Sequence, residues 1–171
     1  CVGDVTQAGF GEQFVKTAME QFGGLDIIVN NAGYPWDSVI QKMSDEQFQA
    51  MLDVHTVAPF RILRAASGPI REMAKQEKSE GKAVYRKVVN VSSIAGLYGN
   101  AGQMAYAAGK SSMIGMTRTM AKEWGRYNVN VNCIAFGLIE TRMTRALDGE
   151  AKTANIGENE IKMGIRPEML E

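Results

Sequence analysis

A tyrosine, a lysine and a serine stand at a spacing that could support proton transfer. Tyr106 and Lys110 are four residues apart in an alanine-rich run, so a helix there would present both on one face. Ser93 follows a β-branched run, Val88–Val91, that predicts a buried parallel strand. Because open α/β sheets bind ligands at the carboxyl ends of their strands, the three side chains are expected to meet at such an edge.

The pairing of a phenol with an ammonium has a chemical reason. A free tyrosine titrates near pH ~10, which is too high for easy proton exchange at neutral pH. A lysine cation close by favours the phenolate and lowers the pKa of the tyrosine, while a serine hydroxyl can hold the substrate oxygen. The Tyr-x-x-x-Lys spacing alone occurs by chance on many helices, so it predicts chemistry only with support from the rest of the chain.

Four sequence blocks supply that support. In chain order they are NNAG at 30–33, NVSS at 90–93, YAAGK at 106–110 and GLIET at 137–141. With thirteen positions from Ser93 to Tyr106, the blocks resemble those of the short-chain dehydrogenase/reductase family, and the resemblance covers essentially all 171 residues. The segment GQMAY at 102–106 is similar to the 3-oxoacyl-carrier-protein reductase branch of that family.

The resemblance implies both a fold and a reaction. The fold would be α/β, with a doubly wound, Rossmann-like parallel sheet in a single domain over residues 1–171. The reaction would move hydride between NADP or NAD and a carbonyl or alcohol carbon. Tyr106 would be the acid/base, Lys110 would lower its pKa and hold the cofactor ribose, and Ser93 would orient the substrate oxygen. A 3-oxoacyl thioester, free or on a carrier protein, is the expected substrate.

Two alternatives stay open. One is an alcohol, sugar or steroid dehydrogenase on the same scaffold. The other is a catalytically weak or inactive reductase-like assembly subunit. Two departures from the family pattern support it, because His55 replaces the usual asparagine and Phe136 replaces a proline. The intact Ser93, Tyr106 and Lys110 argue against it, since a scaffold has no physical need for that trio.

Further positions are implied to contact the cofactor. An apolar run at 25–29 leads into the first block, whose small residues would let the backbone approach a flat ligand. Asp4 and Val5 stand where the family places a pair against the adenine ring, although Asp4 suits a turn or helix cap equally well. The candidate cofactor-binding residues are Asp4, Val5, Asn31, Ala32, Gly33, Tyr106, Lys110, Gly137, Ile139 and Thr141.

His55 is the only histidine of the chain. The family asparagine at this position helps to hold a proton-relay water, so His55 is a candidate catalytic residue. A lone histidine in an apolar helix is more often structural. If His55 takes over the relay, a group that titrates near pH ~6.5 would add an acidic-side pH dependence to activity.

Apolar periodicity predicts helices over 6–21, 45–73 and 103–126, the second beginning at a Ser44 capping box and bending near Pro59. Strands are predicted at 25–29, 88–91 and 129–135, with 1–5 as the tail of another. No glycine-rich phosphate turn is found, and Gly9-Phe-Gly11 lies inside a predicted helix. The sheet is therefore expected to be incomplete and to lack its first strands, and 142–171 is expected to form a substrate lid.

Composition excludes several classes. Lys plus Arg equals Asp plus Glu, 19 against 19, so no global charge predicts nucleic acid or an anionic membrane as a partner. The two cysteines form no metal pattern, and no apolar run approaches the ~20 residues of a membrane span. We expect a cytoplasmic protein without a metal, and the wide apolar surface of the 45–73 helix suits a homodimer or homotetramer. Five basic residues could contact an acidic carrier: Lys75, Lys78, Lys82, Arg86 and Lys87.

Overall fold

The structure is a computed structural model that describes residues 1–139, 152–156 and 159–163. The chain divides into two compact units, Cys1–Ala135 and Phe136–Glu171, and each is described by itself. The single domain expected over residues 1–171 stays a prediction.

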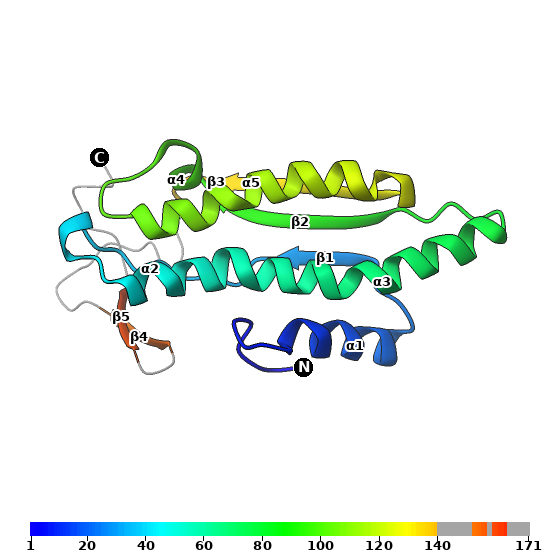
Figure 1. Ribbon diagram of the computed structural model, residues 1–171, viewed down its shortest axis with the longest axis horizontal. Coiled ribbons are helices and arrows are strands. Elements are labelled where there is room, and N and C mark those ends of the chain that lie inside the picture. Colours follow the sequence, from blue (N-terminus) through cyan, green and yellow to red (C-terminus); the bar gives the residue numbers. More distant parts are fainter. Residues whose placement is uncertain (140–151, 157–158, 164–171) are drawn as a thin grey trace. The chain divides into compact units, whose positions relative to one another are not determined.

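A three-stranded sheet organises the first unit. Its strands are β1 (Ile27–Asn30), β2 (Arg86–Ser93) and β3 (Val129–Phe136), in the spatial order β1-β2-β3. β1 and β2 pair in parallel, with Ile27 opposite Lys87 and Asn30 opposite Asn90. Figure 1 shows all three arrows pointing the same way, so the carboxyl ends of the strands meet at one edge. The predicted α/β class and parallel sheet are confirmed.

Three helices cover one face of this sheet: α1 (Phe10–Phe22), α3 (Ala58–Ser79) and α5 (Met104–Trp124). In Figure 1 they run along the sheet with α3 between the other two. Alternate strand residues such as Ile28 and Val88 pack into the core with them, whereas Ile27 and Val29 on the opposite face are exposed. Helices on the second face, which a doubly wound sheet would have, are not among the described elements of this unit.

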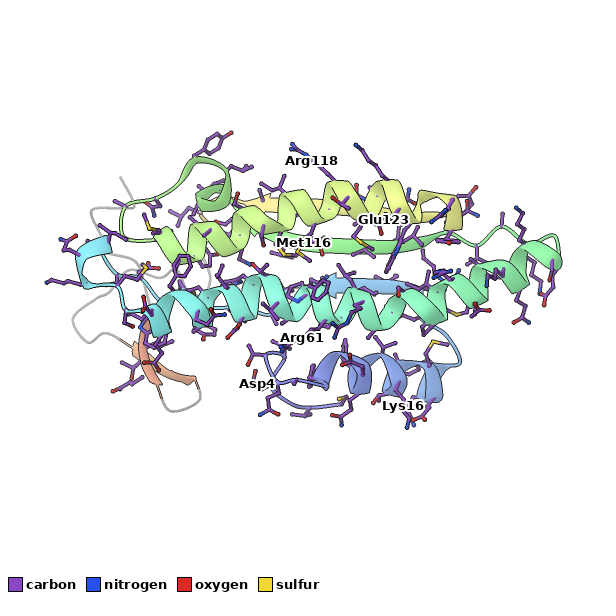
Figure 2. The ribbon with its side chains drawn as sticks, in the orientation of Figure 1. Asp4, Lys16, Arg61, Met116, Arg118 and Glu123 are labelled. Atoms are coloured by element: carbon purple, nitrogen blue, oxygen red, sulfur yellow. The ribbon has the colours of Figure 1, made fainter. Side chains whose placement is uncertain are left out.

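Side chains on α3 and α5 differ in whether they face a neighbouring segment or point away from it (Figure 2). In Figure 2, Met116 lies on the side of α5 that faces α3, while Arg118 points away from it. Met116 is partly buried against the core. Arg61 of α3 faces the amino-terminal segment, where its guanidinium donates a hydrogen bond of 2.7 Å to the Thr6 carbonyl.

The long helix predicted at 45–73 is three consecutive elements. α2 (Asp45–Leu52) begins at the predicted capping box, in which Ser44 and Gln47 exchange side-chain and backbone hydrogen bonds. A π-helical turn, η2 (Asp53–Val57), precedes α3 and Pro59. Proline has no N–H to continue the i→i−4 ladder, and the backbone instead widens so that the Ala58 N–H bonds to Asp53 O. The bend predicted near Pro59 is therefore a bulge placed just before it.

The amino-terminal segment differs from the prediction. Residues 1–5 do not form a strand, because no described strand pairs with them. The Asp4 carboxylate accepts hydrogen bonds from the Thr6 N–H at 2.9 Å and hydroxyl at 2.8 Å, which makes a turn. The helix begins at Phe10 rather than Thr6, after Gly9 at a φ of 84°. A Cβ on Gly11 would lie 3.0 Å from the Arg61 backbone, so this glycine allows close helix packing.

Shorter elements complete the described chain. A short helix that the sequence did not predict, α4 (Ile94–Tyr98), directly follows Ser93, and the 3₁₀ turns are η1 (Ile40–Lys42) and η3 (Gly125–Tyr127). In the second unit β4 (Lys152–Ile156) and β5 (Asn159–Met163) pair antiparallel. Among the described helices, none combines the length and apolar character needed to cross a bilayer.

Candidate active site

The three catalytic candidates lie together at the carboxyl end of β2. Ser93 is the last residue of β2 and the N-cap of α4, where its hydroxyl accepts from the Ala95 N–H at 3.2 Å. Tyr106 and Lys110 lie in the first two turns of α5, and the Lys110 ammonium is 5.7 Å from the centre of the Tyr106 ring. The Ser93 side chain lies close enough to the Tyr106 phenol to lower its pKa. The arrangement therefore joins a hydroxyl, a phenol and an amine.

Three contacts fix the position of Lys110. The Ser92 hydroxyl donates to the Lys110 backbone carbonyl at 2.7 Å, and the Lys110 ammonium donates to Val91 O at 2.9 Å. A Cβ on Gly96 would lie 2.8 Å from the Lys110 carbonyl carbon. The close packing of α4 against α5 therefore requires a residue without a side chain at position 96. The sequence showed Ser92 beside Ser93 but gave no sign that the first serine points inward and holds α5.

Lys110 is a buried cation with little compensation. It is 6% exposed, and burial lowers its pKa to about 8, opposed by the nearby Cys133 thiol. Desolvation disfavours the charged form of a lysine, and one carbonyl does not offset that. The ammonium has donors left for further acceptors, which suits a ligand hydroxyl.

The pKa of Tyr106 differs from the sequence expectation. Burial raises the pKa above its ordinary value, the neighbouring Ser93 side chain opposes this rise, and the charge of Asp37 adds to it. Lys110 was predicted to lower the pKa of Tyr106, yet it is not among the groups that shift it. The ammonium lies over the ring and donates to Val91 O, so it stabilises the phenolate less than a direct partner would.

Asp37 is held near Tyr106 by two hydrogen bonds between its own loop and the loop that precedes α5. The Gln103 side chain donates to the Asp37 carboxylate at 2.8 Å, and the Ser38 N–H donates to the Gly102 carbonyl at the same distance. Burial raises the pKa of Asp37, and the Gln103 hydrogen bond opposes that rise. Sequence reasoning missed this pair, because the two residues lie 66 positions apart and no motif joins them.

His55 lies next to the acid/base candidate, inside η2. It is 1% exposed, its ring meets the Tyr106 ring edge-to-face with 5.1 Å between centres, and its Nε2 lies 2.9 Å from the Tyr34 carbonyl. Burial lowers the pKa of His55 to about 4, and the charge of Lys110 adds to this. If His55 takes part in a proton relay, the acidic-side pH dependence would therefore lie near pH 4 and not near the pH ~6.5 expected from the sequence.

The first of the four sequence blocks, at 30–33, is divided between the core and the surface. Asn31, Ala32 and Gly33 follow β1 directly and are exposed at its carboxyl end. Asn30 points inward instead, and its amide donates to the Asn90 side chain at 2.8 Å, which in turn donates to Thr117 at 2.8 Å. This buried chain ties β1, β2 and α5 together. The exposed small residues and the under-compensated Lys110 ammonium together fit a nicotinamide dinucleotide.

The other cofactor candidates have separate positions. The Asp4 carboxylate accepts the hydrogen bonds of the turn with Thr6. Its charge also contributes to raising the pKa of Tyr34. Val5 is partly buried against the cluster that contains Tyr34 and Tyr106. Gly137 and Ile139 follow β3 along the chain and are exposed residues of the second unit, while Thr141 lies outside the described residues.

The basic stretch has internal partners. The Lys75, Lys82 and Arg86 side chains pair with Glu72, Glu80 and Glu77, respectively. Lys87 donates to the Asn130 side chain at 2.9 Å. This stretch lies near the amino ends of the strands, at the end of the sheet opposite the candidate site (Figure 1). The geometry does not favour it as the place from which a carrier protein would present a substrate. Within the described residues, no group of three or more His, Cys, Asp or Glu side chains could hold a metal ion.

Comparison with known proteins supports the family resemblance seen in the sequence. Residues 1–152 match the family described as short chain dehydrogenase. The 3-oxoacyl-[acyl-carrier-protein] reductase of Vibrio cholerae is 37% identical over 155 residues, which are 91% of this chain and 59% of that protein. The hydroxyacyl-CoA dehydrogenase of Mycobacterium tuberculosis is 38% identical over 91% of this chain and 48% of its own length.

A solved structure of an NAD⁺-bound xylitol dehydrogenase superimposes with a TM-score of 0.71 at 30% identity, covering 82% of this chain and 51% of that one. The chain therefore spans about half to three fifths of the length of these three proteins.

Proposed function

Since this chain belongs to the short-chain dehydrogenase family, we propose that the protein transfers hydride between a nicotinamide cofactor and a carbonyl or alcohol carbon. The observation that carries the proposal is the meeting of Ser93, Tyr106 and Lys110 at the carboxyl end of β2. NADP and NAD are both compatible with it. When bound, the cofactor supplies or accepts the hydride.

The protein residues would handle the proton and the orientation. Ser93 would hold the substrate oxygen through its hydroxyl, beside Tyr106. Tyr106 would donate its phenolic proton to the oxygen in reduction and take it back in oxidation. Its raised pKa keeps the phenol protonated at neutral pH, which favours the acid role and therefore reduction. Lys110, with free donors near the ring, would hold a cofactor hydroxyl and stabilise the phenolate once it forms.

We propose a 3-oxoacyl thioester as the substrate. The identity of 37% to a 3-oxoacyl-[acyl-carrier-protein] reductase and of 38% to a hydroxyacyl-CoA dehydrogenase supports a thioester, on a carrier protein or on coenzyme A. The likeness to the xylitol dehydrogenase structure favours a sugar alcohol as the second candidate. The cytoplasmic location and the homodimer or homotetramer expected from the sequence stay predictions.

The test is turnover by the full-length protein. NADPH or NADH oxidation with acetoacetyl thioesters, and NAD⁺ or NADP⁺ reduction with xylitol, should separate the two substrate classes. Tyr106→Phe should reduce the active pair's kcat by about 1,000-fold, because the proton donor is removed. Tyr85→Phe is the matched control, since Tyr85 is an exposed tyrosine directly before β2, at its amino end.

Unchanged turnover in Tyr106→Phe would reject the mechanism. A wild-type protein that binds neither cofactor would instead support the assembly-subunit alternative.

A further inference from the structure

The hydrogen bond to Tyr34 fixes the tautomer of His55. A backbone carbonyl can only accept, so Nε2 must carry the proton in this 2.9 Å contact. The imidazole is neutral at physiological pH because its pKa is about 4. Nδ1 is then an unprotonated acceptor, and it is buried without a hydrogen-bond partner among the described residues. A histidine held only for stability would be expected to have both nitrogens satisfied.

Two glycines make room for the ring. A Cβ on Gly33 would lie 2.8 Å from His55 Nδ1, and one on Gly109 would lie 2.8 Å from His55 Cβ. Gly33 belongs to the loop that follows β1, and Gly109 belongs to α5, directly before Lys110. The imidazole is thus wedged between the predicted cofactor loop and the helix that carries the acid/base.

The π-helical turn holds the ring in that wedge. On either side of His55, Val54 packs into the cluster with Met51 and Ala105, and the Thr56 hydroxyl hydrogen-bonds to Ser112 of α5 at 2.8 Å. These contacts attach η2 to α5. The histidine position is therefore tied to the register of α5 and not only to its own helix.

We propose that His55 is a positioning residue with two separable contacts. Its ring, edge-to-face with Tyr106, sets the orientation of the phenol, and its Nε2–H holds the Tyr34 carbonyl and with it the loop at 31–34. This inference rests on the proposed function and adds to it a residue that touches neither substrate nor hydride. Asparagine, with one short amide and no ring, could make at most one of these contacts.

Two substitutions separate the contacts. His55→Phe keeps an aromatic ring beside Tyr106 but removes the donor to Tyr34 O. We expect kcat within threefold of the wild type. The dissociation constant of the reduced cofactor that the wild type oxidises, NADPH or NADH, should rise about tenfold in a fluorescence titration, as for the loss of one hydrogen bond. His55→Gln keeps an amide donor but removes the ring. We expect kcat to fall at least tenfold with the affinity for that cofactor within threefold, since a misplaced reacting group costs rate.

Asn130→Ala is the control, because it breaks the hydrogen bond from Lys87 at the amino ends of β2 and β3, away from Tyr106, Tyr34 and His55. It should lower the Tm while leaving both constants within twofold. The proposal is overturned if His55→Phe and His55→Gln change kcat and cofactor affinity together, or if neither constant changes.

Nitrogen-15 NMR of the wild-type imidazole provides a test that needs no variant and no turnover. At pH 7 the His55 signals should report one neutral tautomer with the proton on Nε2. A proton on Nδ1, or a charged ring, would overturn the inference even if the variants do not fold. A protein that shows this tautomer but oxidises neither NADPH nor NADH would contradict the proposed function and not the packing of His55.

Discussion

Two buried cations, at opposite ends of the same sheet, differ in the hydrogen-bond partners that the fold gives them. Arg86, at the amino end of β2, is 3% exposed, and its guanidinium donates to Glu77 at 2.6 and 2.8 Å and to the Leu25 carbonyl at 3.2 Å. Within the part of the chain that the structure describes, the ammonium of Lys110, at the carboxyl end, donates only to the Val91 carbonyl. Glu77 raises the pKa of Arg86, whereas burial lowers that of Lys110 to about 8.

The contrast separates structure from function. A buried charge with a full set of partners contributes to the fold, and removing one partner destabilises it. A buried charge that lacks partners carries a desolvation cost that the isolated chain does not offset. Such sites concentrate where ligands bind. We therefore assign the amino end to stability and the carboxyl end to ligand binding, and four experiments test this assignment.

The largest expected effect is on catalysis at the carboxyl end. Lys110→Met keeps most of the side-chain volume and removes the charge. We expect kcat/KM of the full-length protein to fall about 100- to 1,000-fold, because the group that would hold the cofactor and stabilise the phenolate is gone. The free energy of unfolding should stay the same or rise, since an under-compensated buried charge is replaced by an apolar chain. Steady-state kinetics and urea unfolding measure the two; a large loss of stability would show that both ends are structural.

The corresponding substitution at the amino end of β2 is Arg86→Met. It leaves the Glu77 carboxylate and the Leu25 carbonyl without their donor, so the free energy of unfolding should fall by about 2–4 kcal/mol. The kcat of the folded protein should change less than twofold. Arg118→Met is the control, because Arg118 is exposed on α5, and it should change stability by less than about 0.5 kcal/mol. A fall in kcat comparable to that of Lys110→Met would remove the distinction.

The third prediction concerns the packing around His55. The nearest neighbours of a Cβ on Gly33 are atoms of the imidazole, whereas a Cβ on Gly109 also meets the Met51 backbone carbonyl at 3.0 Å. Gly33→Ala should therefore be partly rescued by His55→Ser, with a coupling energy of about 1–2 kcal/mol in a double-mutant cycle. Gly109→Ala should show almost no coupling to His55→Ser, because the His55 Cβ and the backbone remain. Urea unfolding gives all these values, and equal coupling at both glycines would contradict the geometry.

The smallest effect is a pH dependence of stability. The pKa of Lys110 is lowered in the fold from 10.5 to about 8, so between these values the unfolded chain binds more protons than the folded one. Stability should therefore rise with pH across this window, relative to Lys110→Met, by on the order of 1–2 kcal/mol. Arg86 cannot contribute such a rise, because its pKa is raised in the fold and lies above the window. A flat difference between wild type and Lys110→Met from pH 8 to 10 would show that the ammonium is better solvated than its burial indicates.

Several sequence predictions held because they rest on local geometry. Tyr106 and Lys110 share a helix face whenever that segment is helical, and the Ser44 capping box needs only four residues. The parallel strands were recognisable from short apolar runs. α4 was missed because a five-residue segment containing Gly96 has no periodicity to detect, and its glycine is required by the close approach of α5.

The sequence by itself determined the family, the α/β class and the positions of the hydroxyl, the phenol and the amine, because these follow from the order and spacing of short blocks. Tertiary structure decided how those groups behave. It directed the Lys110 ammonium to Val91 O, brought Asp37 close enough to raise the pKa of Tyr106, and enclosed His55 between two glycines as a neutral ring. Burial and hydrogen bonds between residues tens of positions apart set protonation and orientation, and neither is encoded in any single stretch of the chain.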